Sequence, residues 1–366
     1  MFDLFSPVRD LLITNDIVRI DNVVFKLHCR VTVLLLTVCA ILVTAKQYFG
    51  EPISCMADES IAKEPINAYC WIYSTFTVSR HLKGIPGRSV ASPGVGQALE
   101  NDEIHYHRYY QWVCFVLGIQ AVVFYIPRAL WGMWEGGLVA MLSIDLSSPF
   151  LGTAWTPERK TQLVDYLTKT NLHTHNLYAI RYFFCELMNL INTVGQIYLL
   201  NEFLEGQFTN YGSAVTGFAM ETRPYQRVDP MARLFPKVTK CTIHTFGAGG
   251  SAQTHDALCI LSLNVVNEKV FVLIWFWFIF LAGVGALAVL YRIIVFSQPW
   301  TRIYLLRANA RSIKGVKVSR VVRELHFGDW FLLQQLARNV NPIVFGELIE
   351  ELDTFFTSKK PDELTT

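Results

Sequence analysis

The chain has 366 residues, of which 52% are hydrophobic, 13% aromatic and 17% charged, and its formal net charge is +2. Ordinary soluble domains carry roughly 25% charged residues, so this composition argues against a purely soluble protein. The nearly balanced charge gives no indication of a nucleic-acid partner.

The N-terminal segment 1–27 is short, mixed and amphipathic. Aspartates interrupt Met1–Lys26, so it lacks the apolar core of a signal peptide and we expect no cleaved leader. Ser6 and Pro7 are typical of a helix start. The residues leave two interpretations open: a helix on the inner membrane surface or a helix folded into a pore mouth.

The first apolar segment is Val31–Ala45, which we extend to a span over 28–46 because alone it is short for a bilayer. Thr37 and Thr44 share one helical face. Such a face suits either a water-filled pore or close helix packing, and the sequence does not separate the two.

The second span, 109–131, is the clearest in this half of the chain. Trp112 to Pro127 carries no charge, and aromatic residues stand at both ends of Tyr109–Trp134, as they do where a helix meets both membrane surfaces. Pro127 removes a backbone donor, so we expect a kink there.

The segment 132–177 is polar. Thr156 and Pro157 favour a helix start, and we expect a helix over Pro157–Leu172. His173 and His175 are two residues apart and would not share a helical face, so we interpret them as solvated rather than as metal ligands.

The third span, 178–201, is unusually polar at helical spacing. Polar groups at membrane depth face either other helices or a water-filled cavity. We favour hydrogen bonds between helices, with pore lining as the alternative. The residues concerned are Glu186, Asn189, Asn192, Thr193 and Gln196.

The eight cysteines fall into two groups. Those in apolar stretches are expected to be buried and reduced: Cys29, Cys39, Cys114 and Cys185. The others lie in the long loops 47–108 and 202–269, which indicates disulfides and an oxidising compartment: Cys55, Cys70, Cys241 and Cys259. Four cysteines allow three pairings. Around Cys241, Lys237–Phe246 and the glycine-rich turn that follows predict a small disulfide-tied β structure.

The fourth span is 270–292, and the tail 293–366 begins with a basic run that suits a solvated face beside anionic lipid. Further along we expect helices, one of them over Trp330–Arg338 with Asp329 as its cap. Four spans place both termini on one side. The loop cysteines and the basic tail indicate that this side is cytoplasmic.

The predicted fold class is therefore an all-α polytopic membrane protein. It is a four-transmembrane-helix bundle with disulfide-tied extracellular loops that contain short β-strands, and with a helical cytoplasmic region. We find no P-loop, zinc-protease helix, G-x-S-x-G or paired-carboxylate motif, so we expect no enzyme, no cofactor and no metal. A channel explains the polar third span better than a four-span adhesion protein does.

Several motifs resemble those of the innexins, the gap-junction proteins of invertebrates, and specifically their arthropod branch. The second span opens with the family's pentapeptide and contains its proline, and each outer loop has two cysteines. Ser262 stands where relatives often have proline, and Ala248-Gly249 replaces a more usual Pro-Ser. The matching stretches are Tyr109-Tyr110-Gln111-Trp112-Val113, Pro127, Asp229–Arg233, Phe235–Cys241 and Val266–Lys269.

The resemblance implies a large-pore channel subunit in the plasma membrane at gap junctions. It implies a ring of eight subunits, homomeric or mixed with other innexins, that docks to a hemichannel of the neighbouring cell. Ions and small metabolites would pass by diffusion, without a cofactor. It also implies the disulfides Cys55–Cys259 and Cys70–Cys241, and it moves Glu186 toward helix packing. The implied pore-lining residues are Met1, Phe2, Asp3, Phe5, Thr37 and Thr44.

The alternative with the same four-span architecture is a pannexin-like hemichannel that does not dock. A glycan on the outer loops would hold two rings apart, and no loop asparagine is followed by the Ser/Thr spacing of an acceptor site. This absence permits docking, which we expect. The asparagines inspected are Asn67, Asn101, Asn201, Asn210, Asn264 and Asn267.

Overall fold

The computed structural model describes residues 18–57, 63–83, 88–90, 92–99, 101–147, 155–170, 172–220, 229–310 and 313–359. By length and composition, four of its helical segments can cross a membrane. This number and the helical content confirm the predicted four-span class. The segments are Val23–Phe49, Val113–Glu135, His175–Phe203 and Ser262–Ser297.

The first span begins earlier than we expected. It consists of α2 (Val23–Lys26), a π-helical stretch (Leu27–Val31) and α3 (Thr32–Phe49). The side chain of Asn22 accepts a hydrogen bond from the amide of Phe25 at 2.6 Å and so caps the helix at its start. With 27 residues the segment is long enough for a bilayer, so the short span predicted from Val31–Ala45 was an underestimate.

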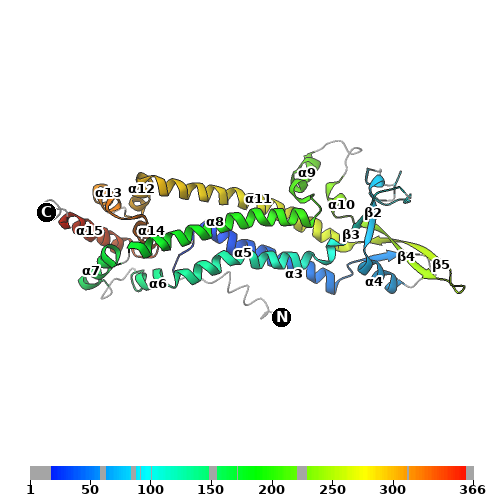
Figure 1. Cartoon of the computed structure of the whole chain (residues 1–366), viewed down its shortest axis with the longest axis horizontal. Helices are drawn as coiled ribbons and strands as arrows, with labels where there is room; N and C mark the ends of the chain where they lie inside the picture. The colour runs from blue at the N-terminus through cyan, green and yellow to red at the C-terminus, as the bar shows by residue number, and fades with distance from the viewer. Residues whose placement is uncertain are drawn as a thin grey trace. The chain divides into compact units, whose positions relative to one another are not determined.

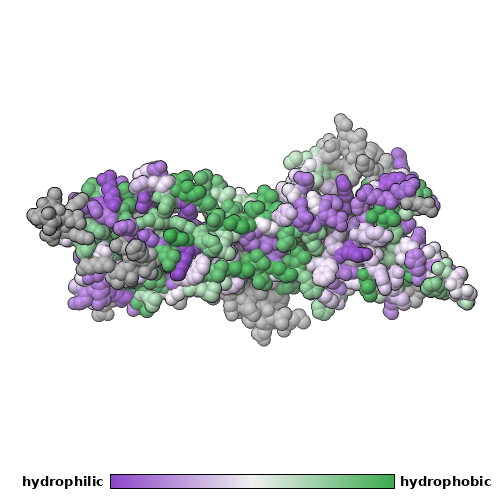
Figure 2. All heavy atoms as spheres, viewed as in Figure 1, coloured by the Kyte–Doolittle hydropathy of each residue, from purple (hydrophilic) through white to green (hydrophobic). Residues whose placement is uncertain are grey.

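The other three spans are single long helices: α5 (Val113–Glu135), α8 (Leu172–Phe203) and α11 (Ser262–Ser297). Helix α5 continues through Pro127. Hydrophobic residues cover the visible surface along α8 and α11 (Figure 2). Many of these side chains are exposed, such as Ile180, Ile191 and Leu287, as expected for helices that face lipid.

The chain divides into two compact units, and each of the four spans passes from one to the other. Unit 1 comprises residues 1–31, 124–191 and 282–366, and unit 2 comprises 32–123 and 192–281. Both ends of the chain therefore belong to unit 1, and both cysteine-containing loops belong to unit 2.

Unit 2 is built around a five-stranded antiparallel sheet of order β1-β5-β4-β2-β3 (Figure 1). The first loop supplies β1 (Ser54–Met56), β2 (Thr75–Val78) and β3 (Ile104–His107). The second loop supplies the long hairpin β4 (Val238–Phe246) and β5 (Ala252–Ile260). The β structure predicted around Cys241 is thus confirmed, and the sheet joins the two loops.

Besides the sheet, unit 2 contains helices from both loops. Helix α4 (Lys63–Tyr73) lies in the first loop, and α9 (Phe208–Met220) and α10 (Pro230–Leu234) lie in the second. Asp229 caps α10, with Pro230 at the first turn. We did not predict α9, which contains no charged residue and has glycines at two positions.

Unit 1 contains the helical region that we expected between the second and third spans and in the tail. Thr156 caps α7 (Pro157–Asp165), which passes into a π-helical stretch (Tyr166–Thr170). The tail forms α12 (Pro299–Asn309), α13 (Gly315–Glu324), α14 (Phe327–Leu336) and α15 (Pro342–Lys359), after the short α6 (Leu138–Ser143) earlier in the chain.

Helix α14 begins at Phe327 after the N-cap residue His326, so the helix predicted over Trp330–Arg338 starts earlier and Asp329 is not its cap. Asp329 lies inside the first turn and is buried. An aromatic core holds α14 against the spans: the ring of Phe331 contacts Tyr182 of α8 at 5.2 Å, and Tyr182 contacts Trp131 of α5 at 4.9 Å.

Candidate functional site

Two disulfides tie the two outer loops together. Cys55 of β1 bonds to Cys259 of β5, and Cys70 of α4 bonds to Cys241 of β4, with Cα–Cα distances of 3.9 and 5.9 Å. These are the pairs that the family resemblance implies. Each bond closes more than 170 residues of chain, with separations of 204 and 171. Cross-links of this kind stabilise chiefly by restricting the unfolded chain.

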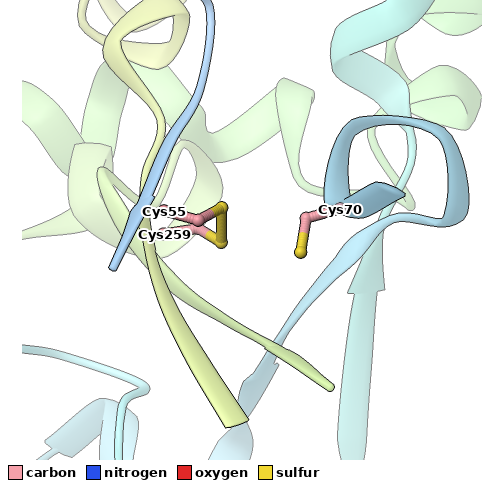
Figure 3. Close-up of side chains that lie close together, drawn as sticks. All are labelled: Cys55, Cys70 and Cys259. Carbon is pink, nitrogen blue, oxygen red and sulfur yellow. A yellow bond between two sulfur atoms is a disulfide. The ribbon is translucent and has the colours of Figure 1, made fainter. Parts of the chain in front are cut away.

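The two disulfides are neighbours inside the unit. Cys70 lies beside the Cys55–Cys259 bond (Figure 3), and the Sγ atoms of these three buried cysteines lie within 4.8 Å of one another. Metal ions bind cysteine as the thiolate, and a sulfur held in a disulfide is not one. This cluster is therefore a cross-linked core rather than a metal centre. The cysteines expected to be buried and reduced (Cys29, Cys39, Cys114 and Cys185) are free and buried.

The hairpin β4–β5 ends in a tight turn. The amide of Gly247 donates to the carbonyl of Ser251 at 2.9 Å, and Gly250 adopts a positive φ of 78° that suits glycine. One of the two departures from the family pattern, Ala248-Gly249, lies in this turn. Phe246, the last residue of β4, is 79% exposed. The hairpin thus ends in an exposed aromatic ring and a turn without bulky side chains.

The motif pentapeptide joins the sheet to the second span. Tyr109–Gln111 forms a 3-10 turn before α5, and the buried ring of Tyr110 contacts Trp71 of α4 at 4.7 Å. The side-chain amide of Gln111 donates to the carbonyl of Trp71. Burial raises the pKa of Tyr110 to about 12, so its phenol is neutral at physiological pH. The pentapeptide therefore packs a loop helix onto a span.

Two further motif stretches meet at the start of the fourth span. The buried carboxylate of Glu268 pairs with Lys237 at 3.1 Å and with Lys269 at 3.2 Å. The side-chain amide of Asn264 donates to the carbonyl of Pro236 at 2.7 Å. These contacts hold the residues just before β4 against α11. They explain why the helix starts at Ser262 although its first two turns contain polar residues. The hydroxyl of Ser262 donates to the carbonyl of Glu51.

Two polar residues of the third span, Glu186 and Asn189, bind other helices in unit 1, whereas Gln196 donates to Asn192 of its own helix at 3.2 Å. Glu186 accepts two hydrogen bonds from Arg292 of α11, from Nε at 2.6 Å and from a terminal nitrogen at 2.9 Å. It also accepts one from the side chain of Asn22. Asn189 accepts from the thiol of Cys29 at 3.3 Å. For Glu186 and Asn189 the predicted bonding between helices is confirmed.

A second charge cluster lies at the start of the first span. The buried carboxylate of Asp21 pairs with Arg128 of α5 at 2.9 Å and with Arg30 at 4.0 Å. The N-terminal segment enters the first span at Asp21 and Asn22. These two residues connect that junction to α5 and α8, and through Glu186 to α11. Sequence reasoning missed the pairing of Asp21, Arg128 and Arg292. The signal was a charge just inside the end of a span for the two arginines, and a charge just before a span for Asp21.

Of the six residues that the resemblance implies for the pore lining, the structure describes Thr37 and Thr44. Met1, Phe2, Asp3 and Phe5 lie outside the described residues. Thr37 is partly buried, and its hydroxyl donates to the carbonyl of Val33 one turn earlier at 2.7 Å. Thr44 is also partly buried. The pore position of all six stays a prediction.

The interpretation of His175 as a solvated histidine was wrong. Its side chain is buried, and Nδ1 lies 2.6 Å from a carboxylate oxygen of Asp329. The π-helical stretch and α14 enclose it, with the ring of Tyr166 at 5.1 Å. His175 therefore joins helix α14 of the tail to the third span. The side chain of His173 lies outside the described residues.

Together these features define a polytopic membrane protein in which four spans connect a helical unit to a disulfide-tied sheet. Comparison with known proteins identifies its kind. The family profile described as Innexin matches residues 21–356. The chain is 51% identical to innexin inx2 of Drosophila melanogaster over 353 residues, covering 96% of this chain and 95% of that one. It is 49% identical to innexin inx2 of Schistocerca americana (96% and 97% covered) and 41% identical to innexin shaking-B of Drosophila melanogaster (96% and 94% covered).

The chain belongs to the innexin family. It is a multi-pass membrane protein and a subunit of gap-junction channels, which pass ions and small molecules between cells.

Proposed function

We propose that the chain assembles into a ring of eight subunits with both termini in the cytoplasm, and that two such rings dock across the gap between cells. The observation that carries this proposal is the joining of both outer loops into one disulfide-tied sheet. Docking buries the loops at the rim of the ring in an interface, so these loops should already be ordered. Cross-linked loops lose less conformational entropy on binding than free loops do. Rings mixed with other innexins remain part of the proposal.

The turn between β4 and β5 supplies the docking surface in this proposal. Phe246 is an exposed aromatic side chain, and residues of this type are enriched at protein interfaces. The loop asparagines carry no glycan acceptor spacing, so the rim is free to meet its partner. Ala248 and Gly249 would influence which partner rim fits.

The N-terminal segment forms the narrow part of the pore in this proposal. Support comes from the junction between this segment and the first span. At this junction Asp21 pairs with Arg128, and Asn22 donates to Glu186, which in turn binds Arg292. The junction is thereby fixed to the other three spans. A segment anchored there can act as a fixed wall of the pore. Met1, Phe2, Asp3 and Phe5, with Thr37 and Thr44 further along, would line it.

Asp3 gives this placement a direct test. A ring of carboxylates raises the local concentration of cations, so Asp3→Asn should shift the reversal potential toward weaker cation preference. The control is Glu202→Asn, which removes an exposed carboxylate near the C-terminal end of α8 and should leave selectivity unchanged. Unchanged selectivity in Asp3→Asn, together with unchanged conductance after deletion of the first ten residues, would contradict the placement.

The proposal as a whole is tested in paired cells that express only this chain. We expect junctional conductance and dye transfer between the cells, and paired-membrane plaques at the contact. Images of purified rings would count the subunits. Hemichannel currents without coupling to this or any related partner would favour the pannexin-like alternative, and adhesion without either current would favour a structural four-span protein.

A further inference from the structure

A pocket with a volume of about 360 Å³ lies in unit 2 where two spans meet the outer loops. Its walls come from β3 and the turn that follows, from the end of α8 and from α10. The lining residues that matter here are Arg108, Trp112, Phe203, Glu205 and Arg233. Trp112 and Arg233 belong to family-matching stretches, and none of the five contributes to the features already described.

Two of the residues that line this pocket are cationic. Arg108 and Arg233 are exposed, and within the described part of the chain neither forms an ion pair. Glu205 is the single carboxylate among the described lining residues, so the two guanidinium groups outnumber it. His107 contributes no positive charge at neutral pH, because burial and the neighbouring His105 lower its pKa to about 4. The pocket therefore favours an anionic ligand.

The apolar wall of this pocket includes two residues at span ends. Trp112 immediately precedes α5 and is exposed, and Phe203 is the last residue of α8. Amphipathic rings at span ends lie at the level of the lipid headgroups. The two guanidinium groups and the apolar wall thus line one pocket, at the depth where a bilayer presents its phosphates.

We propose that this pocket binds the phosphodiester headgroup of a membrane phospholipid. Arg108 and Arg233 contact the phosphate oxygens, because a guanidinium group matches the geometry of phosphate and keeps its charge. Trp112 and Phe203 pack against the glycerol and the first carbons of the acyl chains. A free phosphate ion would satisfy the arginines but would leave the apolar wall uncovered.

Native mass spectrometry of purified full-length rings tests the proposal with three probes: phosphatidylcholine, a neutral glycosyl diacylglycerol with the same acyl chains, and inorganic phosphate. We expect phosphatidylcholine to be retained at least tenfold more strongly than the glycolipid. Arg108→Gln/Arg233→Gln should lose that preference. The matched control Lys63→Gln/Arg88→Gln removes the same charge from exposed loop residues outside the pocket and should keep it.

A second measurement does not depend on any variant. Phosphatidylcholine with a photoreactive group next to its phosphate should cross-link to wild-type peptides that contain Trp112, Phe203 or Leu234. Cross-links confined to other surfaces, or equal lipid retention in both double variants, would overturn the proposal. Displacement of phosphatidylcholine by millimolar inorganic phosphate alone would also overturn it, because the site would then be one for a free anion.

Discussion

At the scale of single residues, the charges inside the spans serve to hold helices together. Glu186 has a side chain that is 7% exposed and Arg292 one that is 14% exposed, so both groups depend on each other for solvation. Breaking a buried ion pair leaves one charge uncompensated, which costs more than the pair itself contributes.

Glu186→Gln should therefore lower the stability of unit 1 by about 3 kcal/mol, because Arg292 keeps its charge without a partner. Thermal unfolding of the purified protein measures the loss. Glu186→Gln/Arg292→Gln should recover most of it, and Glu202→Gln, exposed at the outer end of the same helix, should have little effect. A double variant no more stable than the single one would contradict this role.

His107 gives unit 2 a dependence on pH. In the folded chain its pKa is lowered to about 4 by burial and by His105, and its hydroxyl partner is Thr77 at 2.9 Å. Since the unfolded state binds the proton more readily, stability is greatest above the ordinary histidine pKa of about 6.5 and falls as the pH drops from there toward 4. At pH 5 the loss is about 2 kcal/mol.

Unfolding followed between pH 7.5 and 5 checks this expectation. His107→Gln should flatten the pH dependence in that window, whereas His244→Gln, an exposed histidine of β4, should leave it as in the wild type. Equal slopes in His107→Gln and the wild type would contradict the assignment.

At the scale of elements, close helix contacts depend on small residues. A Cβ atom placed on Gly212 of α9 would lie 2.0 Å from the ring of Trp275 in α11, whose indole nitrogen donates to the carbonyl of Thr209 at 3.0 Å. One residue therefore determines whether α9 can rest on the fourth span. Gly217, in the same helix, has open space at the equivalent position.

Gly212→Ala should separate α9 from α11 and lower the unfolding temperature, with a cost of about 1–3 kcal/mol for overpacking. Gly217→Ala is the matched control, and it should be neutral or stabilising by up to about 1 kcal/mol because alanine favours helix. Thermal unfolding of the purified variants measures both effects. A larger effect from Gly217→Ala than from Gly212→Ala would contradict the packing argument.

The elements also show how far sequence reasoning reaches. The four spans were predictable because a long apolar run has few alternatives to crossing a membrane. Their ends were not, because Asn22 caps the first span and Lys237 binds Glu268 in the fourth, and both are contacts that only the folded chain provides. His175 was misinterpreted for the same reason: its partner Asp329 is far along the chain, and this histidine looks solvated until the helix that covers it is known.

At the scale of the whole molecule, the two disulfides are the covalent links between the first and second outer loops. Cys70→Ala/Cys241→Ala should destabilise unit 2 by about 2–4 kcal/mol and abolish junctional conductance, because the hairpin loses its bond to α4. Cys114→Ala, a free buried cysteine, should retain conductance. Unfolding temperature and paired-cell recording measure the two effects, and normal coupling without the Cys70–Cys241 bond would contradict the need for a cross-linked rim.

The connectivity of these disulfides also sets an order of events during synthesis. Cys55 and Cys70 leave the ribosome 204 and 171 residues before their partners Cys259 and Cys241. At about 5–20 residues per second, the first loop waits roughly 10 to 40 seconds with two thiols and no correct partner. The pair most readily oxidised in that interval, Cys55 with Cys70, is absent from the finished protein. Each newly made chain must therefore either stay reduced until two more spans have been inserted or have that early bond exchanged, and the second route requires thiol–disulfide exchange.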